Sequence, residues 1–175
     1  LYNAMTAPLV PYAIRGFIWY QGESNAHNAF MYPKLFPAQI ADWRAAWGQG
    51  DIPFLFVQIA PWRLSEDQFA PSRWAEVREA QLKTSQEVPN VAMAVITDHG
   101  AEDAHPRHKK TVGERLSLAA RALAYGEVIT YKSPSPASVN IQNSSIVVGF
   151  DSAESGLVAV GEVQGFTLAG DDQVF

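Results

Sequence analysis

The sequence predicts an α/β sandwich, in which helices cover a parallel sheet, followed by the start of a β-rich region. Short apolar runs of strand length alternate with longer segments whose apolar residues recur at helical spacing, and this alternation occurs three times. The runs are largely apolar, as expected of parallel strands that right-handed helical crossovers bury on both faces. After Gly126 short alternating runs and turn residues replace this pattern, which predicts a second, all-β unit.

The first strand and the first helix are expected near the beginning of the chain. Residues 14–20 predict a strand, because most of them are apolar, β-branched or aromatic, and the polar cluster 21–25 that follows predicts a loop. From about residue 33 to residue 47 apolar residues recur at helical spacing, and Gly48 provides a stop signal. This segment predicts an amphipathic helix.

The pattern then repeats twice. Residues 52–60 and 91–96 are apolar runs of strand length, and each predicts a buried strand. Between these runs, Ser72 is a suitable N-cap for a helix that closes before Pro89. Residues 107–125 carry one apolar stripe and predict the third helix.

The last part of the chain has a different character. Residues 133–136, which are serine and proline, predict a linker, and residues 138–175 predict three or four strands, too few to bury both faces of a sheet. We therefore expect one domain over residues 1–130 and the start of a β-rich domain over residues 131–175. Because the chain starts at Leu1 and shows no signal-peptide pattern, we expect it to be a piece of a longer or processed protein.

Composition excludes several classes of function. The chain has 13 Lys and Arg against 18 Asp and Glu, a net charge of -5 and no basic block, which argues against nucleic acid as a partner. The absence of cysteine excludes disulfides, zinc sites with cysteine ligands and cysteine nucleophiles. No apolar stretch approaches the roughly 20 residues that a membrane span needs.

One candidate for chemistry is a histidine at the start of the third helix. His105 precedes Pro106, a favoured first helical residue, and the positive end of the helix dipole disfavours the charged imidazolium there. A neutral histidine can act as a general base, and Asp103 or Glu102 is close enough in sequence to orient its ring. The alternative is that His105 only caps the helix, with exposed acids beside it.

The second candidate is the polar loop after the first predicted strand. Gly22 lies between Gln21 and Glu23, and a glycine at a strand end allows a tight turn that points N–H and amide donors at a ligand. Such donors, with Asn25 close by, could form an oxyanion hole. The alternative is an ordinary turn that polar side chains stabilise.

Two further possibilities remain open in the same loops. Ser24 lies in a segment that imitates a nucleophile elbow, although Ala26 stands where the elbow pattern has its last glycine. His99, His105 and His108 lie near acidic residues, but their spacing matches no zinc signature, so we expect no metal.

Several motifs recur in an order that resembles the sialate O-acetylesterases. They include Trp19-Tyr20-Gln21-Gly22-Glu23-Ser24-Asn25, Asp42-Trp43-Arg44, Arg78-Glu79-Ala80-Gln81, His105-Pro106 and Gly165-Phe166-Thr167-Leu168-Ala169-Gly170. The resemblance implies a three-layer α/β/α fold of the SGNH-hydrolase type, of which residues 1–130 would be the C-terminal part. It also implies that a serine attacks an acetyl ester, that a histidine is the base, and that an oxyanion hole holds the tetrahedral intermediate.

The resemblance assigns roles to individual residues. His105 corresponds to the base, and Asp103 is our choice for the acid that orients it, although Glu102, Asp98 or no acid at all remain alternatives. The Gln21 amide corresponds to an oxyanion donor.

The resemblance also implies roles for the neighbours of Gln21 and for the nucleophile. Gly22, Glu23 and Asn25 would contact the substrate. The nucleophilic serine of the family follows a strand upstream of this loop, and nothing similar precedes Tyr2, so we expect the nucleophile outside this chain and the chain alone to be inactive.

The resemblance implies hydrolysis of O-acetyl esters on a small acetylated sugar, with the 9-O-acetyl group of sialic acid as the first expectation and no cofactor. Three alternatives remain: an esterase for acetylated plant glycans of the xylan type, a non-catalytic carbohydrate-binding module, and a metal-assisted deacetylase. The family's substrates imply a periplasmic or secreted protein.

Overall fold

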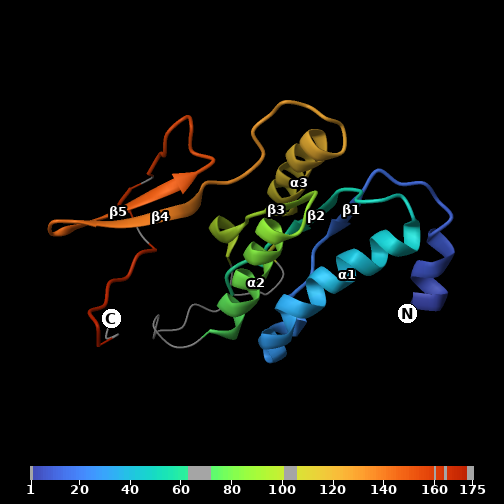
Figure 1. Cartoon of the computed structure of the whole chain (residues 1–175), viewed down its shortest axis with the longest axis horizontal. Coiled ribbons are helices and arrows are strands. Elements are labelled where there is room, and N and C mark those ends of the chain that lie inside the picture. Colours follow the sequence, from blue (N-terminus) through green and yellow to red (C-terminus); the bar gives the residue numbers. More distant parts are fainter. Residues whose placement is uncertain (1, 63–71, 101–105, 160, 164, 173–175) are drawn as a thin grey trace. The chain divides into compact units, whose positions relative to one another are not determined.

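The computed structural model of the chain falls into two compact units (Figure 1). The first unit comprises residues 1–64 and 72–132, and the second comprises residues 65–71 and 133–175. The structure describes residues 2–62, 72–100, 106–159, 161–163 and 165–172.

The first unit contains a parallel sheet of three strands. These strands are β1 (Phe17–Trp19), β2 (Phe54–Val57) and β3 (Val91–Ala94), and their order in the sheet is β1-β2-β3. Phe17 pairs with Phe54, and Phe54 pairs with Val91. All three strands are therefore parallel, and their carboxyl ends lie at the same end of the sheet. The loops that follow these ends are therefore neighbours.

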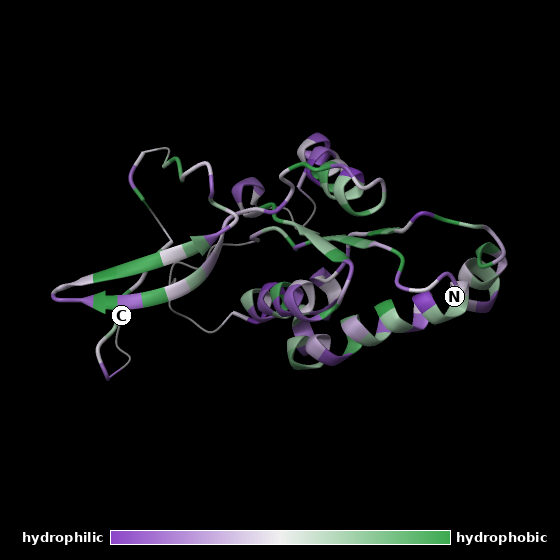
Figure 2. Cartoon of the chain, turned by 45° about the horizontal axis from the view of Figure 1, so that its top comes forward, coloured by the Kyte–Doolittle hydropathy of each residue, from purple (hydrophilic) through white to green (hydrophobic). Residues whose placement is uncertain are grey.

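Three helices cover the two faces of this sheet. Helices α1 (Tyr32–Trp47) and α2 (Arg73–Glu87) pack on one face, where Phe36 and Ile40 of α1 contact a core that includes Phe54. Helix α3 (Lys109–Leu123) packs on the other face against alternate residues of β2 and β3. Figure 2 shows α3 on one side of the strands and α1 with α2 on the opposite side. The α/β prediction is confirmed, and the layers follow the α/β/α order.

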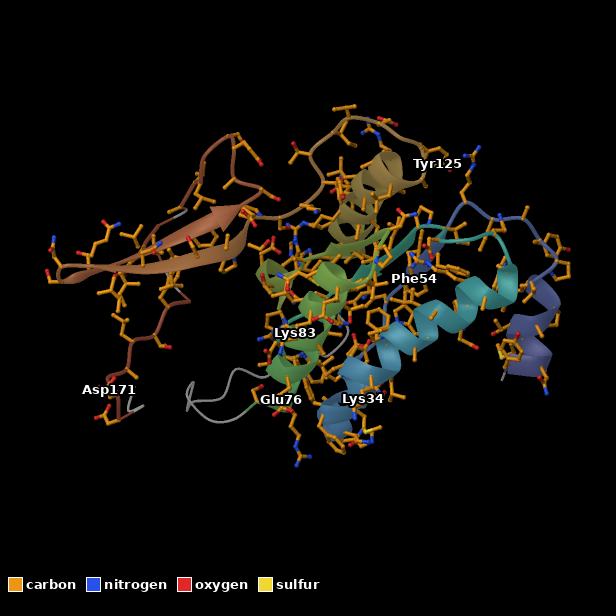
Figure 3. All side chains as sticks on the ribbon, in the orientation of Figure 1. Lys34, Phe54, Glu76, Lys83, Tyr125 and Asp171 are labelled. Carbon is orange, nitrogen blue, oxygen red and sulfur yellow. The ribbon has the colours of Figure 1, made fainter. Side chains whose placement is uncertain are left out.

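Side-chain burial follows this layering. Phe54, in the central strand, is fully buried, whereas the Lys83 and Glu79 side chains form an exposed ion pair on α2. Figure 3 labels Phe54 in the sheet and Lys83 on the helix that covers it. The sheet therefore supplies the apolar core to which the helices attach.

Local signals explain the ends of the helices. The Ser72 side chain accepts a hydrogen bond from the backbone N–H of Ala75, so the predicted N-cap of α2 is confirmed. Gly48 adopts a left-handed conformation with φ of 63°, and its N–H donates to the carbonyl of Arg44, which ends α1 as predicted.

The first strand differs from the prediction. Ile18 is 69 % exposed, although the apolar run predicted a strand that is buried on both faces. The reason is that α3 covers β2 and β3, while β1 lies at the edge of the three-stranded sheet. Short helices also precede and follow this strand, at Tyr2–Thr6, Ala7–Leu9 and Glu23–Met31.

The second unit contains an antiparallel hairpin of β4 (Ser135–Gln142) and β5 (Ser145–Asp151). Strand β4 begins inside the segment that was predicted to be a linker. Residues 138–175 were predicted to form three or four strands, but the described residues after Asp151 contain no further strand. Glycines with positive φ, such as Gly156 and Gly161, interrupt the extended backbone in that region.

No helix in the described part of the chain is long and apolar enough to cross a membrane.

Candidate active site

The loop after β1 contains a glycine that the surrounding side chains require. Gly22 has φ of +150°, and a Cβ atom at this position would lie 2.9 Å from Cγ2 of Ile59 and 3.2 Å from Nε2 of Gln81. The backbone of the loop therefore lies directly on the residues that follow β2 and on helix α2. Only glycine allows both this conformation and this close approach.

The Gln21 side chain is held in one orientation by its neighbours. Its Nε2 donates to Oδ1 of Asn25 at 2.6 Å. The Tyr32 hydroxyl lies 3.3 Å from Oε1 of Gln21 and 3.2 Å from the backbone carbonyl oxygen of Gln21, and its single O–H is shared between these two acceptors. Because the amide oxygen of Gln21 faces Tyr32, the NH2 group of Gln21 points away from Tyr32. One of its two N–H groups donates to Asn25, and the other makes no hydrogen bond within the described residues.

Tyr32 is a permanent donor in this arrangement. Burial raises the pKa of its hydroxyl to about 12, so the O–H keeps its proton at neutral pH.

The predicted loop residues Gln21 and Asn25 line an open cleft of about 760 Å³, together with Trp19, Tyr32 and Asp42. The structure therefore brings the polar end of β1 to the wall of a cleft.

A buried glutamine of helix α2 also supports this loop. Gln81 is fully buried, and its Nε2 lies 3.1 Å from the carbonyl oxygen of Gln21 and 3.3 Å from that of Val57. Its Oε1 accepts a hydrogen bond of 2.9 Å from the N–H of Ile59. In the sequence, Gln81 lies on the helix predicted after Ser72 and in the motif Arg78-Glu79-Ala80-Gln81, but neither assigned it a role. A polar residue on the buried stripe of a predicted helix is the signal that could have found it.

An ion pair and two stacked rings connect the segment after β3 with helix α3 and its N-cap. Arg115 donates to both carboxylate oxygens of Asp98, at 2.7 and 2.6 Å. These hydrogen bonds lower the pKa of the Asp98 carboxyl from 3.8 to about 2. The rings of His99 and His108 stack with their centroids 5.1 Å apart. Because Arg115 occupies both oxygens of Asp98, this geometry argues against Asp98 as the acid that orients a catalytic histidine.

The Asp98 pair makes a testable contribution to stability. The pKa of Asp98 is depressed in the folded protein, so its stabilisation is present above about pH 4 and is lost as the pH falls through about 2. The side chain is half exposed, so we expect Asp98→Asn to cost about 1 kcal/mol or less near neutral pH. Urea unfolding of the wild type and of Asp98→Asn, at neutral pH and near pH 2, measures the difference in their free energies of unfolding. A difference that stays the same near pH 2 would contradict a stabilising role of the ionised Asp98 carboxylate.

Several predicted site residues lie outside the described residues. These are His105, the predicted base, and Asp103 and Glu102, its predicted partners. The neighbouring Pro106 is described and buried, but helix α3 begins only at Lys109, with His108 as its N-cap, so the prediction that Pro106 is the first helical residue is wrong. The roles of the three residues therefore remain predictions.

The structure does describe the two other candidates. Ser24 is exposed in the first turn of the short helix Glu23–Met31, and its hydroxyl has no hydrogen-bond partner among the described residues. The described histidines and carboxylates do not form any group of three that could hold a metal ion. His99 does approach Asp98, at 3.6 Å, but that carboxylate is already paired with Arg115.

Comparisons with known proteins agree on one family. Residues 1–122 match the family model described as carbohydrate esterase, sialic acid-specific acetylesterase. The chain is 39 % identical to the sialate O-acetylesterase of Mus musculus, over 83 % of this chain and 30 % of the relative, and 38 % identical to that of Homo sapiens, over 81 % and 30 %. The chain thus spans about a third of the length of these curated relatives.

A solved structure shows the same similarity in three dimensions. A carbohydrate acetylesterase from Xanthomonas citri superposes with a TM-score of 0.86 and is 42 % identical in sequence. The match covers 98 % of this chain and 41 % of that chain.

Proposed function

The chain belongs to the sialic acid-specific acetylesterase family of carbohydrate esterases, and we propose from this that it forms part of an enzyme that hydrolyses acetyl esters on sugars. The observation that carries the proposal is the Gln21 amide. Asn25 and Tyr32 orient it at the carboxyl end of β1, where ligands bind in open α/β sheets. An oriented donor at a strand end is suited to the stabilisation of a negatively charged oxygen.

The proposed reaction proceeds through a covalent acetyl-enzyme. His105 removes the proton from a serine hydroxyl as its oxygen attacks the acetyl carbonyl, and the carbonyl oxygen becomes an oxyanion. The Gln21 N–H and backbone N–H groups donate hydrogen bonds to this oxyanion. His105 then gives its proton to the departing sugar oxygen. Water attacks the acetyl-serine with the help of the same histidine, and acetate leaves.

The remaining residue roles belong to the same proposal. Asp103 orients the imidazole ring of His105, and Gly22, Glu23 and Asn25 contact the substrate. We propose that the attacking serine lies outside residues 1–175 in the full-length protein. The resemblance to the family motif, in which the nucleophilic serine lies upstream of the loop that contains Gln21, supports this. Residues 1–130 belong to the catalytic domain in this scheme, and residues 131–175 begin a β-rich domain.

The names of the relatives support sialic acid as the sugar that carries the acetyl group, with the 9-O-acetyl ester as the proposed substrate. A periplasmic or secreted location is part of the same proposal.

The substrate is tested by comparison of kcat/KM values for the full-length protein. We expect a higher kcat/KM for 9-O-acetylated sialic acid than for acetylated xylo-oligosaccharides, because the motifs resemble the sialate enzymes. Addition of a chelator should leave both rates unchanged, since the serine mechanism needs no metal. A preference for the acetylated xylo-oligosaccharide would identify the plant-glycan alternative, and loss of activity with the chelator would identify the metal-assisted one.

A further inference from the structure

We infer that Gln81 is a positioning residue, which sets the orientation of the Gln21–Gly22 peptide in the oxyanion loop. The inference rests on the proposed function, because it assigns a role in that reaction to a residue that does not touch the substrate. Gln81 comes from the interior of α2, is separated from Gln21 by 60 residues in sequence, and is fully buried. It therefore acts only through its neighbours.

The hydrogen bonds of Gln81 fix its own orientation first. Its NH2 group donates to two carbonyl oxygens, and its Oε1 accepts from the N–H of Ile59. Exchange of the amide oxygen and nitrogen would place like groups against one another at all three contacts. A buried amide with three such partners has one orientation, and loss of any partner leaves a buried polar group unsatisfied.

Gln81 then fixes the peptide that follows Gln21. The Gln21 carbonyl oxygen accepts from Nε2 of Gln81 at 3.1 Å and from the Tyr32 hydroxyl at 3.2 Å. In a trans peptide the C=O and the next N–H point in opposite directions. Because the oxygen is held towards Gln81 and Tyr32, the Gly22 N–H points away from them. None of the described residues accepts a hydrogen bond from this N–H.

The same contacts connect two strand ends. Val57 is the last residue of β2 and Ile59 follows it, while Gln21 follows β1. Gln81 contacts all three, so it holds the loop after β1 at a fixed position relative to β2. The missing side chain at Gly22 allows this approach, since a Cβ there would lie only 3.2 Å from Nε2 of Gln81. Gly22 and Gln81 therefore act as a pair.

The test uses the full-length protein with Gln81→Met and Gln81→Glu. Gln81→Met keeps the approximate shape of the side chain and removes every hydrogen bond, so kcat should fall about tenfold or more while KM stays within about twofold. Gln81→Glu should show a similar loss near pH 8. Burial raises the pKa of the new carboxyl, and its protonated form can again donate to Gln21. The ratio of variant to wild-type kcat should therefore rise as the pH falls.

Thr84→Val is the matched control. Thr84 lies one turn further along α2, is buried, and donates only to the Ala80 carbonyl within the helix. The Thr84→Val variant loses one buried hydrogen bond on the same helix and should keep the kcat of the wild type. A kcat for Gln81→Met that equals that of Thr84→Val, or a Gln81→Glu ratio that does not vary with pH, would overturn the inference.

A second readout separates this inference from the proposed function. Hydrogen exchange measured by mass spectrometry should be faster in peptides that cover residues 19–25 of Gln81→Met and unchanged there in Thr84→Val. Unchanged exchange in Gln81→Met would overturn the positioning role, whatever the activity. If the wild-type protein releases no acetate, the proposed function fails instead, whereas full activity of Gln21→Leu would refute only the role of Gln21 as an oxyanion donor.

Discussion

Replacement of His105 by alanine in the full-length protein is expected to lower kcat/KM for an acetyl ester by several powers of ten, on the order of 10,000-fold. Without the imidazole no group removes the proton from the serine hydroxyl, and no group returns a proton to the departing sugar oxygen. Steady-state hydrolysis of p-nitrophenyl acetate, with circular dichroism to confirm that the variant is folded, measures this loss.

Two neighbouring histidines provide the control for this prediction. His99 and His108 stack on one another close to the same loop, and they are candidates for the alternative metal site. We expect His99→Ala and His108→Ala to keep activity within about tenfold of the wild type, because neither carries a proton in the proposed reaction. Near-normal turnover by His105→Ala would refute its role, and equal losses in all three variants would favour a site that the three histidines share.

The second large effect is expected for Gln21→Leu, which should lower kcat about 100- to 1,000-fold. Leucine has a similar size but cannot donate a hydrogen bond to the oxyanion. Because that bond is made in the transition state, KM should change little. Measurement of kcat and KM for the same acetyl ester separates these two effects.

Gln49→Leu is the matched control for Gln21→Leu. Gln49 is also a hydrogen-bonded glutamine, since its amide pairs with the backbone N–H and carbonyl of Ile14. Ile14 precedes β1 and Gln21 follows it, so the contact of Gln49 lies at the amino end of the strand and the candidate site lies at its carboxyl end. Loss of the hydrogen bonds between Gln49 and Ile14 should reduce the stability of the protein and leave kcat unchanged. A Gln21→Leu variant that behaves like Gln49→Leu would show that Gln21 is a structural residue only.

The sequence predicted the first unit well because its signals are strong and local. Helices α1 and α2 were placed within a residue or two, since Gly48 and Ser72 mark their ends through their own backbone and side-chain geometry. The exposure of Ile18 could not be predicted, because burial depends on which elements cover a strand and not on the strand itself. The same limit applies to the hairpin β4–β5, which begins inside a predicted linker.

The candidate site was predicted in part. The position of Gln21 after a predicted strand was enough to place its loop at the carboxyl end of the sheet, where ligands bind in open α/β folds. The contacts of Gln81 with the loop could not be predicted from the sequence in the same way. Its contacts join α2 to two strand ends, one of them 60 residues away in the chain, and no local pattern encodes such a meeting. Only its polarity on a buried helix face distinguishes it in the sequence.

The most direct test of this account is to trap the acetyl-enzyme. The full-length protein is mixed with p-nitrophenyl acetate, quenched in acid within the first turnovers, and digested, and the acetylated peptide is identified by mass spectrometry. We expect one acetylated serine, and we expect it to lie outside residues 1–175. Acetylation of Ser24, or release of acetate with no acetyl-enzyme at any time, would contradict it.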